Sequence, residues 1–300
     1  MFIAFKKSVN LALFKNSLLK KILTLLALAL GCSTGNLPVI ADIPILLREV
    51  SGIETINNSE NIWMLNDSGN KPELFLVNPK GKIQKVLKID SKNRDWEDLT
   101  ADKEGNLYIG NFGNNGNDSK KLSILKVSKD SLNNEDKTRV EKISFRYEDQ
   151  EKFPPKKKNR YFDCEAFFHF NNNLYLFTKS RVKDDYGKTN LYKIPATKGK
   201  HEAKLIGSFK TCDDLPCWVT AADISDDGRT IALLTLNTVW TFTDFENDDF
   251  FSGKETKYDL GFESQKESIC FKDNTTVYIA DEYTAGVGGN LYELKLEPKS

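Results

Sequence analysis

Four glutamates recur in a short sequence pattern, and their chemistry is that of a metal site. In each of four segments an acid is followed two positions later by an apolar residue, and these acids are Glu54, Glu97, Glu165 and Glu267. A fifth segment, residues 220–224, has Ala222 at that place. Several carboxylates cannot lie close together in ionised form without a cation, a bound basic group or raised pKa values. Because Ca²⁺ prefers hard oxygen ligands, we hypothesise a calcium ion held by these side chains.

Further polar and aromatic residues are expected near these acids. Asp67 and Asp281, in two segments that we expect to be loops, are predicted to join the glutamates as metal ligands. The side chains predicted to contact a ligand are Trp96, Asn111, Lys179, Arg181 and Tyr283. Such a surface would offer carboxylates, amides, cations and aromatic rings to a peptide, a glycan or a phosphorylated small molecule.

The sequence offers little for hydrolysis through a covalent nucleophile. His169 and His201 are the only histidines, each stands alone, and no plausible Cys–His pair is present. This favours a binding or scaffold module. The alternatives are a metal-dependent phosphoesterase, in which Lys179 and Arg181 clamp the phosphate, and a glycosidase in which two carboxylates act as acid and base.

The elements that must position these residues are short strands in a repeat. Each segment of the pattern opens a first strand, and Asn, Asp and Gly residues that suit tight turns separate it from a second. Second strands are predicted at 62–65, 107–109, 174–177, 231–234 and 277–280, third strands at 73–77, 122–125, 190–194, 238–242 and 290–294, and fourth strands at 83–89, 140–147, 204–209 and 256–260. Four strands per repeat predict a single all-β propeller of five blades. Six blades are the alternative, because the long stretch 97–165 has room for another.

The chain ends after the third strand of the fifth repeat, so one strand is missing from that blade. We predict that an N-terminal strand at residues 43–49 supplies it and closes the ring. Closure of this kind removes the exposed sheet edges that would otherwise pair with other chains. Residues 43–300 are accordingly assigned to the propeller domain.

A propeller brings distant residues together because its blades present equivalent positions to one central axis. Within each blade the strands run alternately up and down. The start of each innermost strand and the loop between the second and third strands therefore lie on one face. The sequence thus predicts an acidic site at one mouth of the central channel. In the alternative interpretation, the glutamates accept hydrogen bonds from amides of the neighbouring innermost strand and only fix the spacing of the blades.

The N-terminal segment has the parts of an export signal. Lys20 and Lys21 precede an apolar run at residues 22–30 and then Gly31 and Cys32. The run is about half of the ~20 residues that a membrane-spanning helix needs. The segment 28–32 resembles a bacterial lipobox, which predicts a signal peptide at residues 1–31, lipidation of Cys32 and a linker at 32–42. We therefore expect a protein held at the bacterial outer membrane by its lipid, facing the periplasm or the surface.

Charge and cysteine content complete the prediction. The chain has 43 basic and 43 acidic residues, but residues 1–31 hold five lysines and no acid, so the remainder is net acidic. A mildly acidic protein without a basic face is a poor candidate for binding nucleic acid. Export permits disulfides, and we predict one between Cys212 and Cys217. A metal site at this pair is disfavoured because no second Cys/His pair accompanies it.

Three stretches of the sequence resemble propeller lipoproteins of Bacteroidota whose function is largely unassigned. These stretches are residues 63–70, 95–99 and 105–115, and the resemblance extends over most of residues 45–295. It implies a periplasmic or surface location. A Glu at the opening of the innermost strands is more distantly similar to the phytase-like propellers, which hold calcium near the channel mouth. Because the diagnostic phytase motifs are not visible, this resemblance assigns no catalytic residue.

Overall fold

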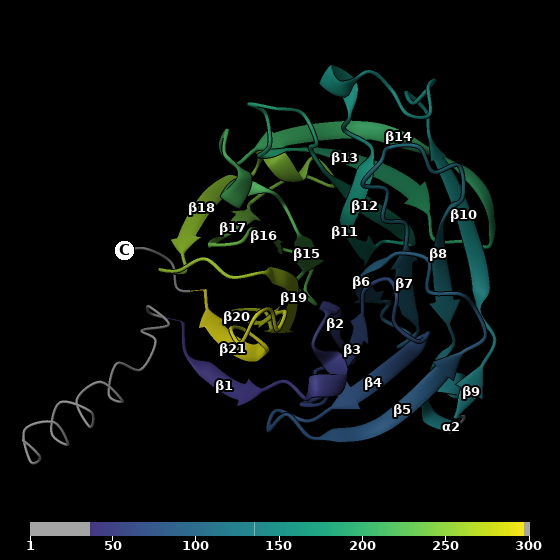
Figure 1. Ribbon diagram of the computed structural model, residues 1–300, viewed down its shortest axis with the longest axis vertical. Helices are drawn as coiled ribbons and strands as arrows, with labels where there is room; N and C mark the ends of the chain where they lie inside the picture. Colours follow the sequence, from purple (N-terminus) through teal and green to yellow (C-terminus); the bar gives the residue numbers. More distant parts are fainter. Residues whose placement is uncertain (1–36, 135, 297–300) are drawn as a thin grey trace, which may run out of the picture. The chain divides into compact units, whose positions relative to one another are not determined.

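Short apolar runs separated by turn residues form β-strands throughout the part of the chain that the structure describes. This computed structural model describes residues 37–134 and 136–296 (Figure 1). The predicted signal segment, residues 1–31, and Cys32 lie outside these residues. No helix among the described residues has the length and apolar character needed to cross a lipid bilayer. The all-β prediction is confirmed.

The strands follow one another in four groups of four and a last group of three, and consecutive strands of a group pair in antiparallel fashion. The first group is β2 (Val50–Thr55), β3 (Ile62–Asn66), β4 (Glu73–Val77) and β5 (Ile83–Ile89). The second is β6 (Trp96–Ala101), β7 (Leu107–Asn111), β8 (Leu122–Val127) and β10 (Glu141–Tyr147). The third is β11 (Asp163–Phe170), β12 (Asn173–Lys179), β13 (Lys188–Pro195) and β14 (Gly199–Lys210). The fourth is β15 (Ala221–Ile224), β16 (Thr230–Leu234), β17 (Thr238–Thr243) and β18 (Lys254–Asp259), and the last is β19 (Lys266–Asp273), β20 (Thr276–Asp281) and β21 (Asn290–Lys295).

Two short strands and several short helices complete the description. β1 (Val39–Asp42) pairs antiparallel with β21, and β9 (Lys137–Thr138) pairs parallel with β5. β10 pairs parallel with β14, which joins the second and third groups into one eight-stranded sheet. The helices are η1 (Ile45–Leu47), α2 (Lys129–Asn134), η2 (Lys157–Asn159), η3 (Leu215–Cys217) and η4 (Phe250–Ser252).

The predicted N-terminal strand at residues 43–49 is wrong in its position. The strand that pairs with β21 is Val39–Asp42, which falls within the segment predicted to be a linker. Pro44 follows it and begins the 3₁₀ turn η1. Proline fixes φ near −65° and has no amide hydrogen to donate to a ladder, so the chain leaves the sheet at this point.

The first strands of the groups lie side by side around a central channel. β2 lies beside β6, β6 beside β11, β11 beside β15 and β15 beside β19, and β19 lies beside β2 (Figure 1). Apolar side chains fill the space between neighbouring sheets. Phe112 and Phe167, for example, meet edge to face between the second and third groups, with ring centroids 5.1 Å apart. Strands arranged radially in this way form a β-propeller, as predicted.

A disulfide joins Cys212 to Cys217 in the loop that precedes β15, with a Cα–Cα distance of 5.7 Å. The other two cysteines of the described residues, Cys164 and Cys270, are free and buried. The disulfide encloses η3, and Trp218 follows it directly. The loop therefore fixes the position of a side chain that belongs to the site described below.

The packing of the N-terminal segment against the last sheet can be tested with two truncations of similar size. Leu37 is buried among apolar side chains that include Tyr292 and Ile279. Leu37→Ala should lower the free energy of unfolding by about 2–5 kcal/mol, because it leaves a cavity in this core. Val39→Ala, at a position that is 40% exposed, should cost much less. Urea unfolding of both variants checks the prediction, and equal losses would contradict it.

Candidate functional site

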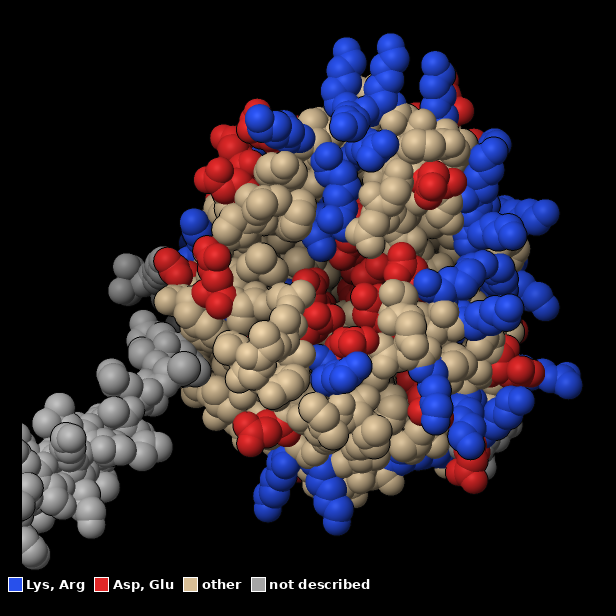
Figure 2. All heavy atoms as spheres, in the orientation of Figure 1, with Lys and Arg blue, Asp and Glu red and all other residues tan. Residues whose placement is uncertain are grey.

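β-Bulges place three glutamates at one end of the channel. The pairing of β6, β11 and β19 with the next strand shifts register near the start of each strand, and the extra residues are Glu97, Glu165 and Glu267. A bulge turns a side chain away from its regular direction in the pleat. The space-filling view shows acidic side chains gathered in a central hollow (Figure 2). We call this end of the channel the mouth.

The first strand, β2, has a bulge at the same place, but the extra residue there is Ser51. Its hydroxyl donates a hydrogen bond of 2.9 Å to the carbonyl oxygen of Trp96. Glu54 lies three positions further along β2 and is therefore not equivalent to Glu97. The prediction that Glu54 belongs to the same site is wrong, because the bulge, and not the distance to an apolar residue, decides which side chain enters the mouth.

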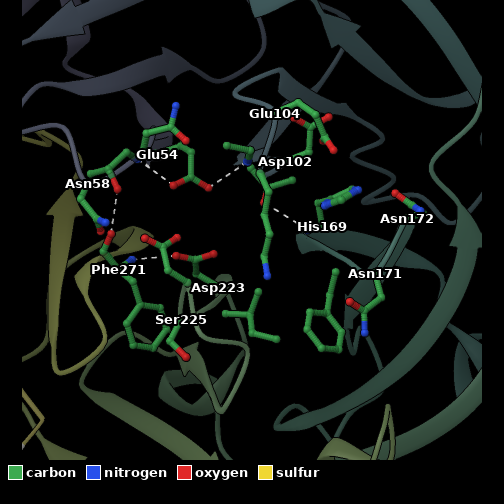
Figure 3. A pocket seen from close by; sticks show the side chains of 18 residues that line it. Glu54, Asn58, Asp102, Glu104, His169, Asn171, Asn172, Asp223, Ser225 and Phe271 are labelled. Carbon is green, nitrogen blue, oxygen red and sulfur yellow. Dashed lines mark hydrogen bonds between the residues drawn. The ribbon is translucent and has the colours of Figure 1, made fainter.

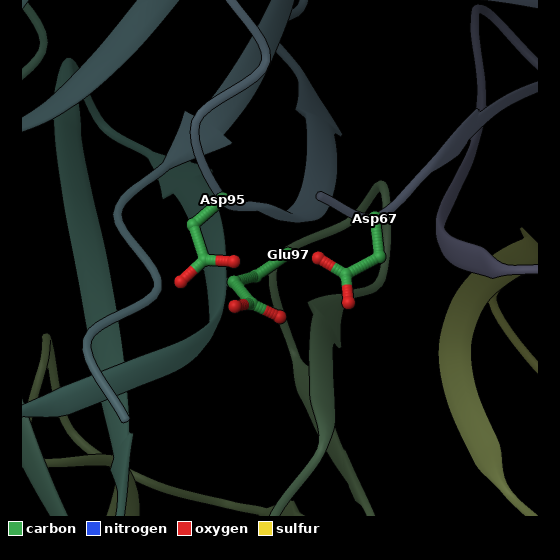
Figure 4. A group of neighbouring side chains, drawn as sticks. All are labelled: Asp67, Asp95 and Glu97. Atoms are coloured by element: carbon green, nitrogen blue, oxygen red, sulfur yellow. The ribbon is translucent and has the colours of Figure 1, made fainter. Parts of the chain in front are cut away.

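Three carboxylates at the mouth lie close enough together to hold one metal ion. Oxygen atoms of Asp67, Asp95 and Glu97 all lie within 4.8 Å of one another (Figure 4). Asp67 follows β3, and Asp95 comes directly before β6. Burial and the charges of Glu165, Asp67 and Asp95 raise the pKa of Glu97 well above its usual value. Burial and the Asp67 carboxylate raise the pKa of Asp95 to about 6.

Gly113, in the loop after β7, lies directly against the carboxylates of Glu97 and Asp95. A Cβ atom at position 113 would overlap Oε1 of Glu97 and Oδ2 of Asp95. Only a glycine therefore lets the backbone approach the two carboxylates in this arrangement.

Two cations, Lys179 at the end of β12 and Arg181 in the loop after it, enter the mouth from the sheet next to that of Glu97, and both are paired. Nζ of Lys179 is 3.1 Å from Oε2 of Glu165. Arg181 contacts Glu165 through its terminal nitrogen at 3.1 Å and Asp163 through Nε at 2.5 Å. Both cationic groups also lie 5.0 Å from the ring centre of Trp218, whose Nε1 donates a hydrogen bond to the carbonyl oxygen of Ser180. Glu165 and Asp163 thus neutralise these two bases within the mouth.

Two more acids complete the mouth, Glu267 from β19 and Glu282 after β20. Burial raises the pKa of Glu267 to about 7, while the nearby Lys179 lowers it. Burial and the charges of Glu267 and Asp67 raise the pKa of Glu282 to about 8. We call the whole set the mouth cluster: the acids Asp67, Asp95, Glu97, Asp163, Glu165, Glu267 and Glu282, and the bases Lys179 and Arg181. Its acids outnumber its bases.

The structure thus brings together four of the predicted metal ligands, namely Asp67, Glu97, Glu165 and Glu267, and separates two. Asp281 is fully buried, and its carboxylate accepts hydrogen bonds from the amide of Asn290 and the hydroxyl of Tyr292, both at 2.8 Å. It therefore holds the connection between β20 and β21 together. The prediction of Asp281 as a metal ligand is wrong because these donors already satisfy the carboxylate.

Some of the predicted ligand contacts lie at the mouth, and others are buried in the fold. Trp96 is fully buried in the core between the first and second sheets, so its prediction as a ligand contact is wrong. Asn111 is buried and shapes the turn before β6, where its Oδ1 accepts from the amides of Arg94 and Asp95. Lys179 and Arg181 lie in the mouth as described, and Tyr283 is exposed next to Glu282.

Several residues of the mouth are not among the predicted metal ligands and ligand contacts. They are Asp95, Asp163, Glu282, Gly113 and Trp218. A signal for the first two is present in the sequence, because Asp95 and Glu97 repeat the spacing of Asp163 and Glu165. The second acid of each pair, Glu97 or Glu165, is the extra residue of a bulge, and the first acid lies two positions before it. Both acids of each pair therefore lie at the mouth.

A second group of carboxylates lies further along the channel and is satisfied by backbone amides. Glu54 accepts from the amides of Thr55 at 2.7 Å and Ala101 at 3.0 Å. Asp98 accepts from Phe167 at 3.0 Å, and Asp223 accepts from Phe271 at 2.6 Å. The bonds from Ala101, Phe167 and Phe271 each join an innermost strand to its neighbour, whereas Thr55 lies on the same strand as Glu54. For these three acids the structure supports the alternative interpretation, in which carboxylates fix the spacing of the blades.

A cavity of about 510 Å³ opens at this other end of the channel (Figure 3). Glu54 and Asp223 point into it from opposite sides (Figure 3). Its rim is formed by the turns that follow the first strands, with Asn58, Glu104 and Asn172 among them. The cavity is polar, but its two deepest acids already accept hydrogen bonds from the backbone, unlike Glu97 at the mouth.

Comparisons with known proteins find distant structural similarity and no matching family. No protein-family model matches the sequence. No curated protein matches it either. A catalytically inactive virginiamycin B lyase from Staphylococcus aureus with quinupristin is 14% identical, with a TM-score of 0.40 over 83% of this chain and 67% of that chain. The hydrazine synthase of Kuenenia stuttgartiensis is 13% identical, with a TM-score of 0.38 over 78% of this chain and 56% of that one. A nidogen/laminin complex is 8% identical, with a TM-score of 0.47 over 82% and 76% of the two chains.

The second group of carboxylates predicts how stability depends on pH. Burial raises the pKa of Asp223 to about 7, so the folded protein holds this proton more tightly than the unfolded chain does. The stabilisation from the protonated form is complete below the unfolded pKa and is lost as the pH rises toward about 7. The free energy of unfolding of the wild type should therefore fall between about pH 5 and about pH 8. That of Asp223→Asn should fall by a few kcal/mol less over the same range.

Glu104→Gln is the control, because Glu104 lines the same cavity as Asp223 but is exposed. Its loss of stability between the two pH values should equal that of the wild type. Urea unfolding at both pH values measures the effect. Equal losses in the wild type and in Asp223→Asn would refute the assignment.

Proposed function

We propose that this chain is a five-bladed β-propeller that works as a ligand-binding module at its acidic mouth. The pairing of β1 with β21 supports five blades of four strands each, with the ring closed by the N-terminal strand. The apolar cluster shared by Ile53 of β2 and Tyr278 of β20 also supports closure, because it packs the first blade against the last. A closed ring would hold the mouth residues rigidly and so limit the entropy lost on binding.

The observation that carries the proposal is the approach of Asp67, Asp95 and Glu97 within 4.8 Å of one another. The two bases of the mouth cluster are paired with Glu165 and Asp163, and neither forms an ion pair with these three acids. A divalent cation would allow all three to be ionised, and carboxylate oxygens are the ligands that Ca²⁺ prefers. The bound cation would then offer free coordination positions to an oxygen atom of the ligand.

The ion pairs of Lys179 and Arg181 favour a binding module over a phosphoesterase. A phosphate clamp needs cations whose charge is available to the substrate, whereas both cations here contact Glu165. The hydrolase alternatives can be tested with chromogenic phosphate esters and furanosides, with and without Ca²⁺. We expect no turnover. Turnover that Glu165→Gln abolishes would instead establish the enzyme.

We further propose that Cys32 carries a lipid and that this lipid holds the protein at the bacterial outer membrane. The apolar run followed by Gly31 and Cys32 supports this. Metabolic labelling with a clickable palmitate analogue should mark the wild type and not Cys32→Ser, and the variant should leave the membrane fraction. Labelling of both proteins alike would contradict lipidation at this residue.

Calorimetric titration of the propeller with Ca²⁺ tests the metal site. The wild type should bind Ca²⁺ and gain about 2.7 kcal/mol of stability when the free ion is at a hundred times its dissociation constant. Glu97→Gln should weaken binding at least about tenfold, because it removes one charged ligand. Gly113→Ala should weaken it as well without altering any charge, because the added methyl group displaces the Glu97 and Asp95 carboxylates.

Glu104→Gln is the control for charge alone, since Glu104 is an exposed acid at the other end of the channel. It should bind Ca²⁺ like the wild type. No heat and no thermal shift in the wild-type protein would rule out the ion.

A further inference from the structure

Large apolar side chains are exposed next to the mouth. Among the described residues, two of the most exposed lie on η1, Ile45 at 67% and Leu46 at 64%. Two others lie on the loop between β20 and β21, Tyr283 at 44% and Val287 at 66%. We call these four residues the rim patch. Exposed apolar side chains that gather on adjacent loops are typical of interaction sites.

Backbone hydrogen bonds join the two loops of the rim patch. The amide of Ile43 donates to the carbonyl oxygen of Gly289, and the amide of Tyr283 donates to that of Arg48, both at 2.7 Å. Within the second loop, Thr284 and Val287 exchange two hydrogen bonds, at 2.8 and 3.0 Å. The patch is therefore held in shape before any partner arrives, which lowers the entropic cost of binding.

The rim patch is continuous with the mouth cluster. Nδ2 of Asn66 donates to the carbonyl oxygen of Leu46 at 2.8 Å, and the amide of Asp67 donates to that of Glu49 at 2.9 Å. Glu282 of the mouth cluster directly precedes Tyr283 of the patch. In the space-filling view, uncharged surface borders the acidic hollow (Figure 2). A single partner can thus contact both surfaces.

We propose that the mouth and the rim patch together bind a peptide segment in which a Lys or Arg is flanked by apolar residues. This rests on the proposed function, in which the mouth is the binding site. The basic side chain would enter the mouth, where Glu267 and Glu282 lie outside the three carboxylates proposed to hold the cation and outside the ion pairs of Lys179 and Arg181. Its N–H groups would donate charge-assisted hydrogen bonds to free carboxylates. The flanking apolar side chains would cover Ile45, Leu46 and Val287.

Charge also argues against the other occupants of an apolar patch. An anionic lipid surface would be repelled by the acids beside the patch. In a symmetric dimer built on the patch, two acidic mouths would face each other, which like charges disfavour. A basic peptide is the partner for which charge and apolar surface act in the same direction.

A peptide array gives the test. Its members carry one Lys or Arg flanked by every pairing of Leu, Ile, Val, Phe, Tyr and Trp, and matched members carry Glu at the centre or Ser on both sides. The propeller should bind a subset of the first set and none of the matched peptides. The tightest peptide, with a fluorescent label, is then titrated by anisotropy at saturating Ca²⁺.

Two double variants separate the patch from general surface effects. Ile45→Ser with Leu46→Ser should weaken binding of the labelled peptide at least about tenfold and leave Ca²⁺ binding unchanged. Leu205→Ser with Ile206→Ser is the matched control, because these two side chains are exposed at 43% and 39% on β14. The control should bind the peptide like the wild type, and both variants should unfold at the same temperature.

The outcomes distinguish this inference from the proposed function. If Ca²⁺ binds but no basic peptide does, or if the rim variant binds the peptide as tightly as the wild type, the inference fails and the cation site stands. If neither Ca²⁺ nor any peptide binds, both proposals fail. Binding of neutral phosphatidylcholine vesicles, or dimerisation in sedimentation, that the rim variant abolishes would assign the patch to lipid or to a second copy and overturn the inference.

Discussion

A carboxylate that is buried away from water needs a hydrogen-bond donor or a cation beside it. The channel of this propeller provides backbone donors toward one end and cations at the other. Toward one end, amides of the neighbouring innermost strand donate to Glu54, Asp98 and Asp223. At the mouth, Lys179 and Arg181 neutralise Glu165 and Asp163. Asp67, Asp95 and Glu97 form no ion pair with these two bases, and the bulge at Glu97 turns its side chain out of the regular ladder. The two ends of one channel therefore differ in chemistry although they are built from the same repeat.

The repeat pattern predicted the strands well, because short apolar runs and Asn, Asp or Gly turns are local signals. It did not predict the bulges, which depend on how two strands pair. Glu54 follows the same spacing as Glu97, yet Ser51 occupies the bulge of the first strand. Trp96 illustrates the same limit. It lies between two acids in the sequence, but Trp96 is buried in the core, whereas Glu97, the extra residue of the bulge, enters the mouth.

The N-terminal part shows how a single proline changes the use of a segment. A strand at residues 43–49 is reasonable from its apolar residues, but the pairing segment ends at Asp42 and Pro44 begins η1. Residues 43–49 are thereby free to cross the rim of the mouth. Local pattern alone cannot place such a turn, because the choice between strand and turn depends on the edge that β21 offers.

The parallel pairing of β10 with β14 has a consequence for the outer surface. The outermost strand of a radial sheet normally leaves one edge bare, which can recruit a strand from another molecule. Here Ile143–Tyr147 and Gly199–Ala203 cover each other, so two of these edges are sealed within one chain. The backbone amides that join β10 to β14 should exchange with solvent more slowly than those of an unpaired outermost strand. The second and third blades should move as one body. Any widening of the channel would then come from the other side of the ring.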